Sequence, residues 1–99
     1  MDKNGYPTEE ELETIKNWDL VERPVIELIE YVRERWQYVD YGAFELKGKR
    51  ILKLELHTCG WSGNESIIKA LQDNSLFWAT CWEKSTRGGH YYFKIPSYL

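Results

Sequence analysis

Long apolar runs are absent from this chain of 99 residues. A membrane-spanning helix needs about 18 or more consecutive apolar residues, and no segment comes near that length. The opening residues 1–11 are acidic and hold no apolar core, so we expect no secretory signal. These absences argue against a membrane partner and favour a protein of the cytoplasm.

Cysteine is also scarce, since Cys59 and Cys81 are the only two. Two cysteines are too few for a disulfide framework, and we interpret them as free thiols in a reducing compartment. A zinc site needs three or four converging ligands, but no two cysteines are spaced as C-x-x-C and the only histidines are His57 and His90. We therefore expect neither a metal site nor a cofactor.

Positive charge is not concentrated enough for a polybasic arm, because the net charge of the chain is −3. Residues 1–36 carry ten acids against five bases, whereas residues 37–99 carry six acids against eight bases. The front of the chain is thus acidic and the back mildly basic. On charge alone, this argues against tight binding of duplex nucleic acid.

Aromatic residues, in contrast, are abundant: they make up 15% of the chain and include five tryptophans. The hydrophobic fraction of 42% and the charged fraction of 29% are ordinary, so we expect one folded domain over residues 1–99, with a loose lead-in at residues 1–7. The rings have two interpretations. Either large side chains build the core of a small protein, or some rings lie exposed on a binding surface.

Two helices are expected in the first part of the chain. Thr8 and Glu11 match a capping box, which predicts a helix from Thr8 to about Trp18. Pro24 suits the first turn of a second helix, and apolar residues at three- and four-residue spacing continue it over residues 24–37.

Segments in which apolar and polar residues alternate, and a third helix, follow along the chain. Ser62 and Glu65 match a second capping box, and the helix that they begin should end near residues 73–74. Apolar alternation and turn residues predict four strands, at residues 41–46, 50–57, 76–84 and 89–95. The expected fold is therefore α+β, in the order α-α-β-β-α-β-β, with a four-stranded and mostly antiparallel sheet packed by helices.

The last hairpin decides which side chains share a face. If it turns near Arg87, Trp82 lies near Tyr92, and Leu54 and Phe93 point into the core together with Ile29 of the second helix. The opposite face would then hold Trp78, Thr80, Trp82, His90, Tyr92 and Lys94, joined by Lys53, Glu55 and His57. A helix could instead cover this face, and a register slip of one residue would exchange the two faces.

Rings interleaved with cations on an open sheet are typical of proteins that hold single-stranded nucleic acid or nucleotides. We expect a non-enzymatic binding module, whose ligand or protein partner contacts this aromatic and basic face and the exposed hairpin loop. The candidate binding residues are Trp78, Trp82, His90, Tyr92, Lys94, Lys53, His57 and Arg87. No catalytic residue is assigned, because no nucleophile, base and orienting group stand out together.

Two alternatives stay open. The acidic helices could present residues 9–13 and 27–34 to a basic protein partner, as an inhibitor or regulator does. A small hydrolase or nucleotide-handling enzyme could be centred on His57, Ser62 and His90.

The segment at residues 57–64, HTCGWSGN, is the most unusual one in the chain. It runs from a strand through two glycines into a helix N-terminus, where free backbone N–H groups could bind an anion. Its glycines are not spaced as G-x-G-x-x-G, and it holds no GKS or GKT sequence, so it does not match a phosphate-binding loop. The other interpretation is a β-to-α turn whose glycines allow close packing.

Residues 58–65, TCGWSGNE, and residues 87–93, RGGHYYF, resemble segments of small proteins encoded by bacteriophages and prophages. The opening PTEEEL at residues 7–12, followed by Trp-Asp at residues 18–19, is similar as well. The resemblance covers about a third of the chain. It implies a phage or bacterial origin and the cytoplasm of the host cell, and it carries over no activity.

Overall fold

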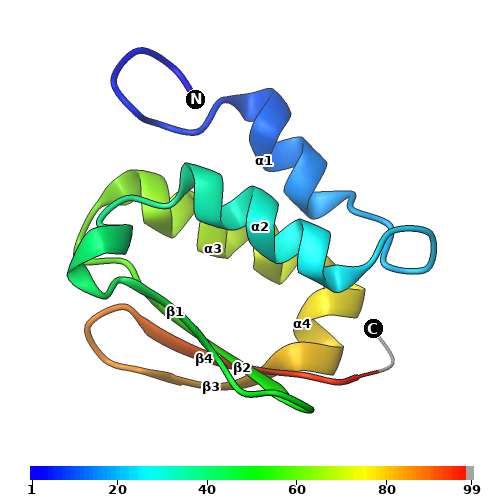
Figure 1. Cartoon of the computed structure of the whole chain (residues 1–99). Coiled ribbons are helices and arrows are strands. Elements are labelled where there is room, and N and C mark those ends of the chain that lie inside the picture. Colours follow the sequence, from blue (N-terminus) through cyan, green and yellow to red (C-terminus); the bar gives the residue numbers. More distant parts are fainter. Residues whose placement is uncertain (98–99) are drawn as a thin grey trace.

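The computed structural model describes residues 1–97, which form helices and one antiparallel sheet (Figure 1). The expected α+β fold is confirmed. The helices are α1 (Glu9–Lys16), α2 (Val25–Arg35), α3 (Ser62–Asp73) and α4 (Ser75–Cys81), with a short 3-10 helix at Val39–Tyr41. The strands are β1 (Phe44–Lys47), β2 (Leu52–His57), β3 (Trp82–Thr86) and β4 (His90–Ile95).

The sheet joins two hairpins along their inner strands, in the order β1-β2-β4-β3. The helices lie on one side of it (Figure 1). Leu54 of β2 pairs directly with Phe93 of β4, and both side chains are buried on the helix side. Ile29 of α2 is buried as well, so the prediction that these three residues belong to the core is confirmed.

The two predicted capping boxes have different outcomes. At α1 the Thr8 hydroxyl accepts from the Glu11 amide at 3.1 Å, and the Glu11 carboxylate accepts from the Thr8 amide at 2.9 Å, as expected. At α3 the prediction is wrong, because Trp61 is the N-cap and Ser62 is already helical. A tight turn places Trp61 there, with the Trp61 amide donating to the Thr58 carbonyl at 3.0 Å.

The strand predicted at residues 76–84 is wrong over its first part, which forms α4. Phe77 and Cys81 are buried and Ala79 is exposed. Residues four apart share one face of a helix, so this burial follows the helical period. Asn74 begins the helix, since its side-chain oxygen accepts from the Phe77 amide at 3.2 Å.

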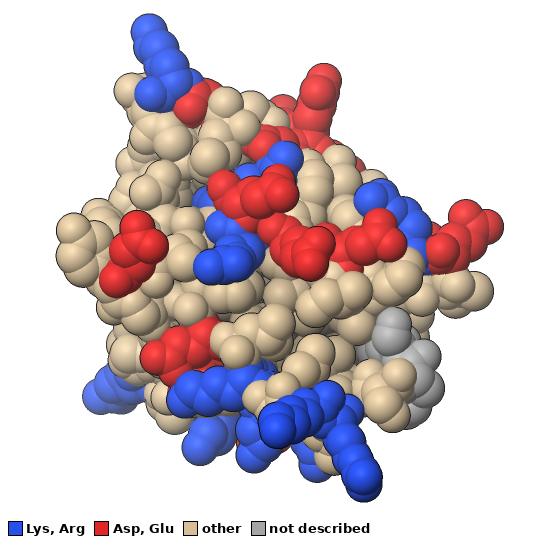
Figure 2. All heavy atoms as spheres, viewed as in Figure 1, with Lys and Arg blue, Asp and Glu red and all other residues tan. Residues whose placement is uncertain are grey.

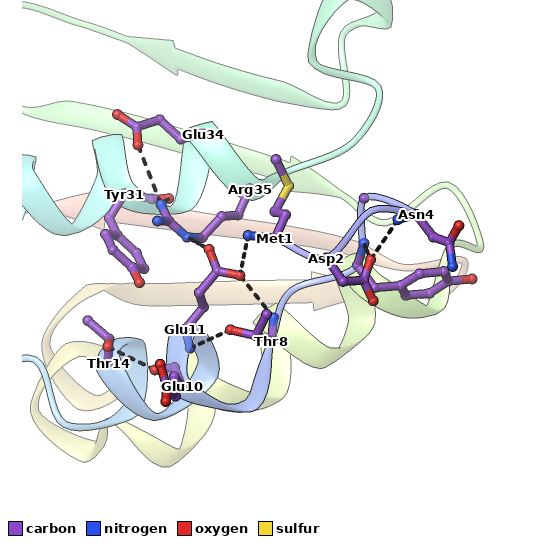
Figure 3. Close-up of polar contacts among 12 residues, drawn as sticks. Met1, Asp2, Asn4, Thr8, Glu10, Glu11, Thr14, Tyr31, Glu34 and Arg35 are labelled. Atoms are coloured by element: carbon purple, nitrogen blue, oxygen red, sulfur yellow. Dashed lines mark hydrogen bonds and ion pairs between the residues drawn. The ribbon is translucent and has the colours of Figure 1, made fainter.

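Glu11 ties α1 to α2 (Figure 3). Its carboxylate accepts from the Arg35 guanidinium, from the Thr8 amide and from the amino group of Met1, which lies 2.6 Å away. The Arg35 guanidinium in turn stacks on the Tyr31 ring. Burial raises the pKa of Glu11, but the bonds from Met1, Thr8 and Arg35 outweigh it and lower this pKa to about 2.

Within residues 1–97, no helix combines the length and the apolar character that crossing a bilayer requires.

Candidate functional site

The side of the sheet that faces away from the helices presents polar and aromatic side chains. Across the two central strands, Lys53 pairs with Lys94, Glu55 with Tyr92 and His57 with His90. Directly opposed residues share a face, and the helices lie on the other side (Figure 1). We call this surface the outer face, and its residues are Glu45, Lys47, Lys53, Glu55, His57, Lys84, Thr86, His90, Tyr92 and Lys94.

The charges of the molecule are segregated between the sheet and the helices. The hairpin segments, residues 44–57 and 82–95, carry seven Lys and Arg against three Glu, a net charge of +4. Because the whole chain has a net charge of −3, the rest of it carries −7. Figure 2 shows the basic side chains mostly along the lower side, where Figure 1 places the sheet, and acidic ones mainly above them.

Lys47 neutralises two of the hairpin acids. Its ammonium lies 3.0 Å from the Glu45 carboxylate and 3.2 Å from that of Glu55. The hydrogen bond from Lys47 lowers the pKa of Glu45, and the same bond raises the pKa of Lys47. Within residues 1–97 the other hairpin cations, which form no ion pair, are Lys49, Arg50, Lys53, Lys84, Arg87 and Lys94. The outer face is therefore basic outside the Lys47 cluster.

Tyr92 provides the central ring of this face and is half-buried. The Lys84 ammonium lies 4.9 Å from the ring centroid, and the His57 ring approaches Tyr92 edge-on with centroids 6.2 Å apart. Tyr92 therefore contacts both a cation and another ring on this face.

His57 and His90 contact each other through their Nδ1 atoms, which are 2.7 Å apart. One of these nitrogens must donate and the other accept. The ring centroids are 4.9 Å apart, so the two nitrogens point at each other and not at a shared third atom. Within residues 1–97, no third histidine, cysteine or carboxylate completes a metal-binding group with them.

Trp78 and Trp82 do not lie on the outer face, and here the sequence-based assignment is wrong. Trp82 pairs with Phe93 and not with Tyr92, because the ladder is irregular between Trp82 and Lys84. This bulge shifts the register and moves the Trp82 ring to the helix side. There it stacks on Trp78 with centroids 5.8 Å apart, while the Trp78 ring meets Phe93 edge-on.

Arg87 is exposed in the turn between β3 and β4. The turn is held against the start of the β2–α3 connection, since the Thr58 amide donates to the Gly89 carbonyl at 2.9 Å. A Cβ at Gly89, where φ is +83°, would lie 2.1 Å from the Thr58 hydroxyl, so only glycine fits. Arg87 is thus fixed at the end of the sheet where His57 and His90 lie.

Packing accounts for the unusual segment at residues 57–64. The Asn64 side chain is fully buried and bonds to the backbone of Gln37 and Thr58. Gly63 lies under the Trp61 ring, which a Cβ at that position would meet at 2.2 Å, and Trp61 stacks on Tyr6. These contacts favour the interpretation as a β-to-α turn.

The catalytic alternative gains no support from this geometry. Ser62 is exposed, and among the described residues neither histidine bonds to it. Lys47 and Lys84, in contrast, belong to the outer face but were absent from the sequence-based candidates. The alternation of Glu45 and Lys47 in β1 could have indicated Lys47, whereas Lys84 depends on the bulge.

No protein-family model, curated protein or solved structure was found to match the chain.

Proposed function

We propose that this protein is a small, non-enzymatic binding module that holds single-stranded nucleic acid on the outer face. The observation that carries the proposal is the combination, on the sheet face opposite the helices, of the Tyr92 ring with cations that form no ion pair within residues 1–97. The exposed cations Lys53 and Lys94 lie opposite each other beside this ring. Stacking on rings and contacts to phosphates together hold single strands without sequence preference.

The chemistry of the face favours a single strand over a duplex. A duplex hides the faces of its bases, so it would offer only phosphates to this surface. The net charge of +4 on the hairpins is modest, and the remaining −7 repels a long polyanion. A single strand can place an unstacked base on Tyr92 and its phosphates near Lys53 and Lys94.

The proposal uses Tyr92 as the stacking ring and leaves Trp78 and Trp82 out, since these rings lie on the helix side. It also places the protein in the cytoplasm, which for a phage-encoded protein is that of the host cell. Single-stranded nucleic acid is present there during replication and transcription.

Fluorescence anisotropy of a dye-labelled single-stranded oligonucleotide at low salt tests the proposal. Stacking contributes about 1–3 kcal/mol per base, so Tyr92→Ala should weaken binding roughly 5- to 150-fold. The double variant Lys53→Glu/Lys94→Glu should abolish binding. The matched control is Lys16→Glu/Lys69→Glu, which changes the net charge equally at exposed lysines of α1 and α3 and should bind nearly as wild type does.

Absence of wild-type binding at low salt, or equal losses in the two double variants, would contradict the proposal. The acidic surface of the helices would then be the better candidate, acting on a basic protein partner. The specific observation in its favour is the charge of −7 outside the hairpins, although Glu11 is buried in its ion pairs and not available. The exposed acids of α1 and α2 are Glu9, Glu10, Glu13, Glu27, Glu30 and Glu34.

A further inference from the structure

The contact between His57 and His90 depends on the number of protons that the two rings carry. A neutral imidazole has one N–H and one bare nitrogen, whereas both nitrogens of an imidazolium are donors. The separation of 2.7 Å between the two Nδ1 atoms therefore requires one of them to be bare. If both rings are charged, two N–H groups meet head-on and the contact breaks. Acidification therefore opens the contact once both rings carry a charge.

Ionisable groups of all four strands surround the pair. β1 contributes Glu45, whose carboxylate senses the charge of His57, and β2 contributes Glu55. Tyr92 of β4 lies edge-on to His57, and β3 presents the uncharged Thr86 opposite His90 and Lys84 two positions before it. Both carboxylates are already bound to Lys47, and among residues 1–97 neither accepts from a histidine. The freed N–H donors thus have no partner of their own on this face.

The surroundings suit an oxyanion. Lys53 and Lys94, which form no ion pair in the described part of the chain, lie further along the same two strands, and the exposed Arg87 lies in the adjacent turn. Gly88 of that turn lies close to His90, since a Cβ at Gly88 would be 3.2 Å from the His90 Nε2 atom.

We infer that His57 and His90 form a proton-gated phosphate subsite of the outer face. At neutral and higher pH the rings bind each other. At acidic pH both are charged, the contact opens, and their N–H groups donate to a phosphate. The inference rests on the proposed function for its natural ligand, a phosphate of a bound single strand, although free phosphate has the same chemistry.

The first experiment measures oligonucleotide affinity by anisotropy with a pH-insensitive rhodamine label, from pH 8.0 to pH 5.5 at constant ionic strength. Wild-type affinity should rise at least about tenfold as the pH falls, because two charged donors join the site. His57→Gln/His90→Gln should lose this rise, whatever its affinity at pH 8.0. Lys94→Gln should weaken binding throughout and keep the rise. A rise in the histidine variant, or a flat wild type, would overturn the inference.

The second experiment uses the wild-type protein and inorganic phosphate alone, and follows the histidine ring resonances by NMR. Phosphate should shift the resonances of both rings at pH 5.5 and not at pH 8.0. If no oligonucleotide binds at either pH and phosphate still shifts them, the proposed function fails and the subsite stands as a site for free phosphate. If phosphate does not shift them at pH 5.5, the subsite is refuted, even where oligonucleotides bind at pH 8.0.

Discussion

The Asn64 side chain binds both backbone groups of Gln37. Its oxygen accepts from the Gln37 amide at 3.0 Å, and its nitrogen donates to the Gln37 carbonyl at 3.2 Å. The Asn64 nitrogen also donates to the Thr58 carbonyl at 3.4 Å. One fully buried carboxamide thus joins α3 to the segment that follows α2, in the way that a strand residue pairs with its neighbour.

We predict that Asn64→Ala lowers the free energy of unfolding by about 1–3 kcal/mol, because buried backbone groups lose their partners. Chemical denaturation followed by circular dichroism measures the change. Gln72→Ala is the control, since Gln72 is exposed on the same helix and its loss should cost under about 0.5 kcal/mol. Equal stabilities of the two variants would show that the Asn64 bonds contribute nothing.

The two helix starts predict unequal costs for similar substitutions. Thr8→Ala removes the cap of α1 and should lower the free energy of unfolding by about 0.5–2 kcal/mol. Ser62→Ala should cost under about 0.5 kcal/mol, because the side chain of this exposed first residue of α3 caps nothing. Thermal and urea denaturation of both variants compares them, and a larger loss for Ser62→Ala would mean that Ser62 caps α3 after all.

The ion pairs of Glu11 predict a loss of stability in acid. The folded-state pKa of Glu11 is about 2, whereas the ordinary value is 4.5, so the unfolded chain takes up this proton first. The stabilising contribution of Glu11 is therefore complete above about pH 4.5 and disappears as the pH falls to about 2. Glu11→Gln should cost about 1–3 kcal/mol at pH 7. Urea denaturation of both proteins from pH 7 to pH 2 should show this difference shrinking, and a constant difference would contradict the assignment.

The two cysteines should differ in reactivity. Cys59 is exposed, whereas Cys81 is buried and its burial raises the pKa of the thiol to about 12. Because the thiolate is the reacting form, Ellman's reagent should modify one thiol of the folded protein and two in denaturant. Cys59→Ser should abolish the reaction of the folded protein, and rapid modification of two native thiols would show that α4 opens readily.

Local patterns were sufficient for much of the fold. The capping box at Thr8 depends on residues three apart, and the alternation around Leu54 depends on neighbours within one strand. Both features were predicted correctly, because the contacts that decide them are close in sequence. The same alternation placed Lys53 and His57 on one face, where the structure has them.

The errors arose where contacts between residues far apart in the sequence determine the local structure. Burial of Phe77 and Cys81 fits a strand and a helix equally well in the sequence. The helix is selected by Asn74, which caps it while donating to the carbonyls of Ile15 and Trp18, 59 and 56 positions away. The side of the sheet on which Trp82 lies depends on a β-bulge, and no turn residue in the sequence indicates that bulge.

The pairing of β2 with β4 also sets the order in which the molecule folds. Each hairpin closes through a short turn, but His57 and His90 are 33 positions apart, with α3 and α4 between them. Loop closure over such a distance costs entropy that local contacts must first offset, so we expect this pairing to form late and to limit the folding rate. A folding intermediate with both hairpins formed would already carry every cation of the sheet, yet Lys53 would not face Lys94 and the two histidines would not meet. The outer face is therefore a property of the completed fold alone, and recovery of its ligand binding during refolding should coincide with the slowest phase.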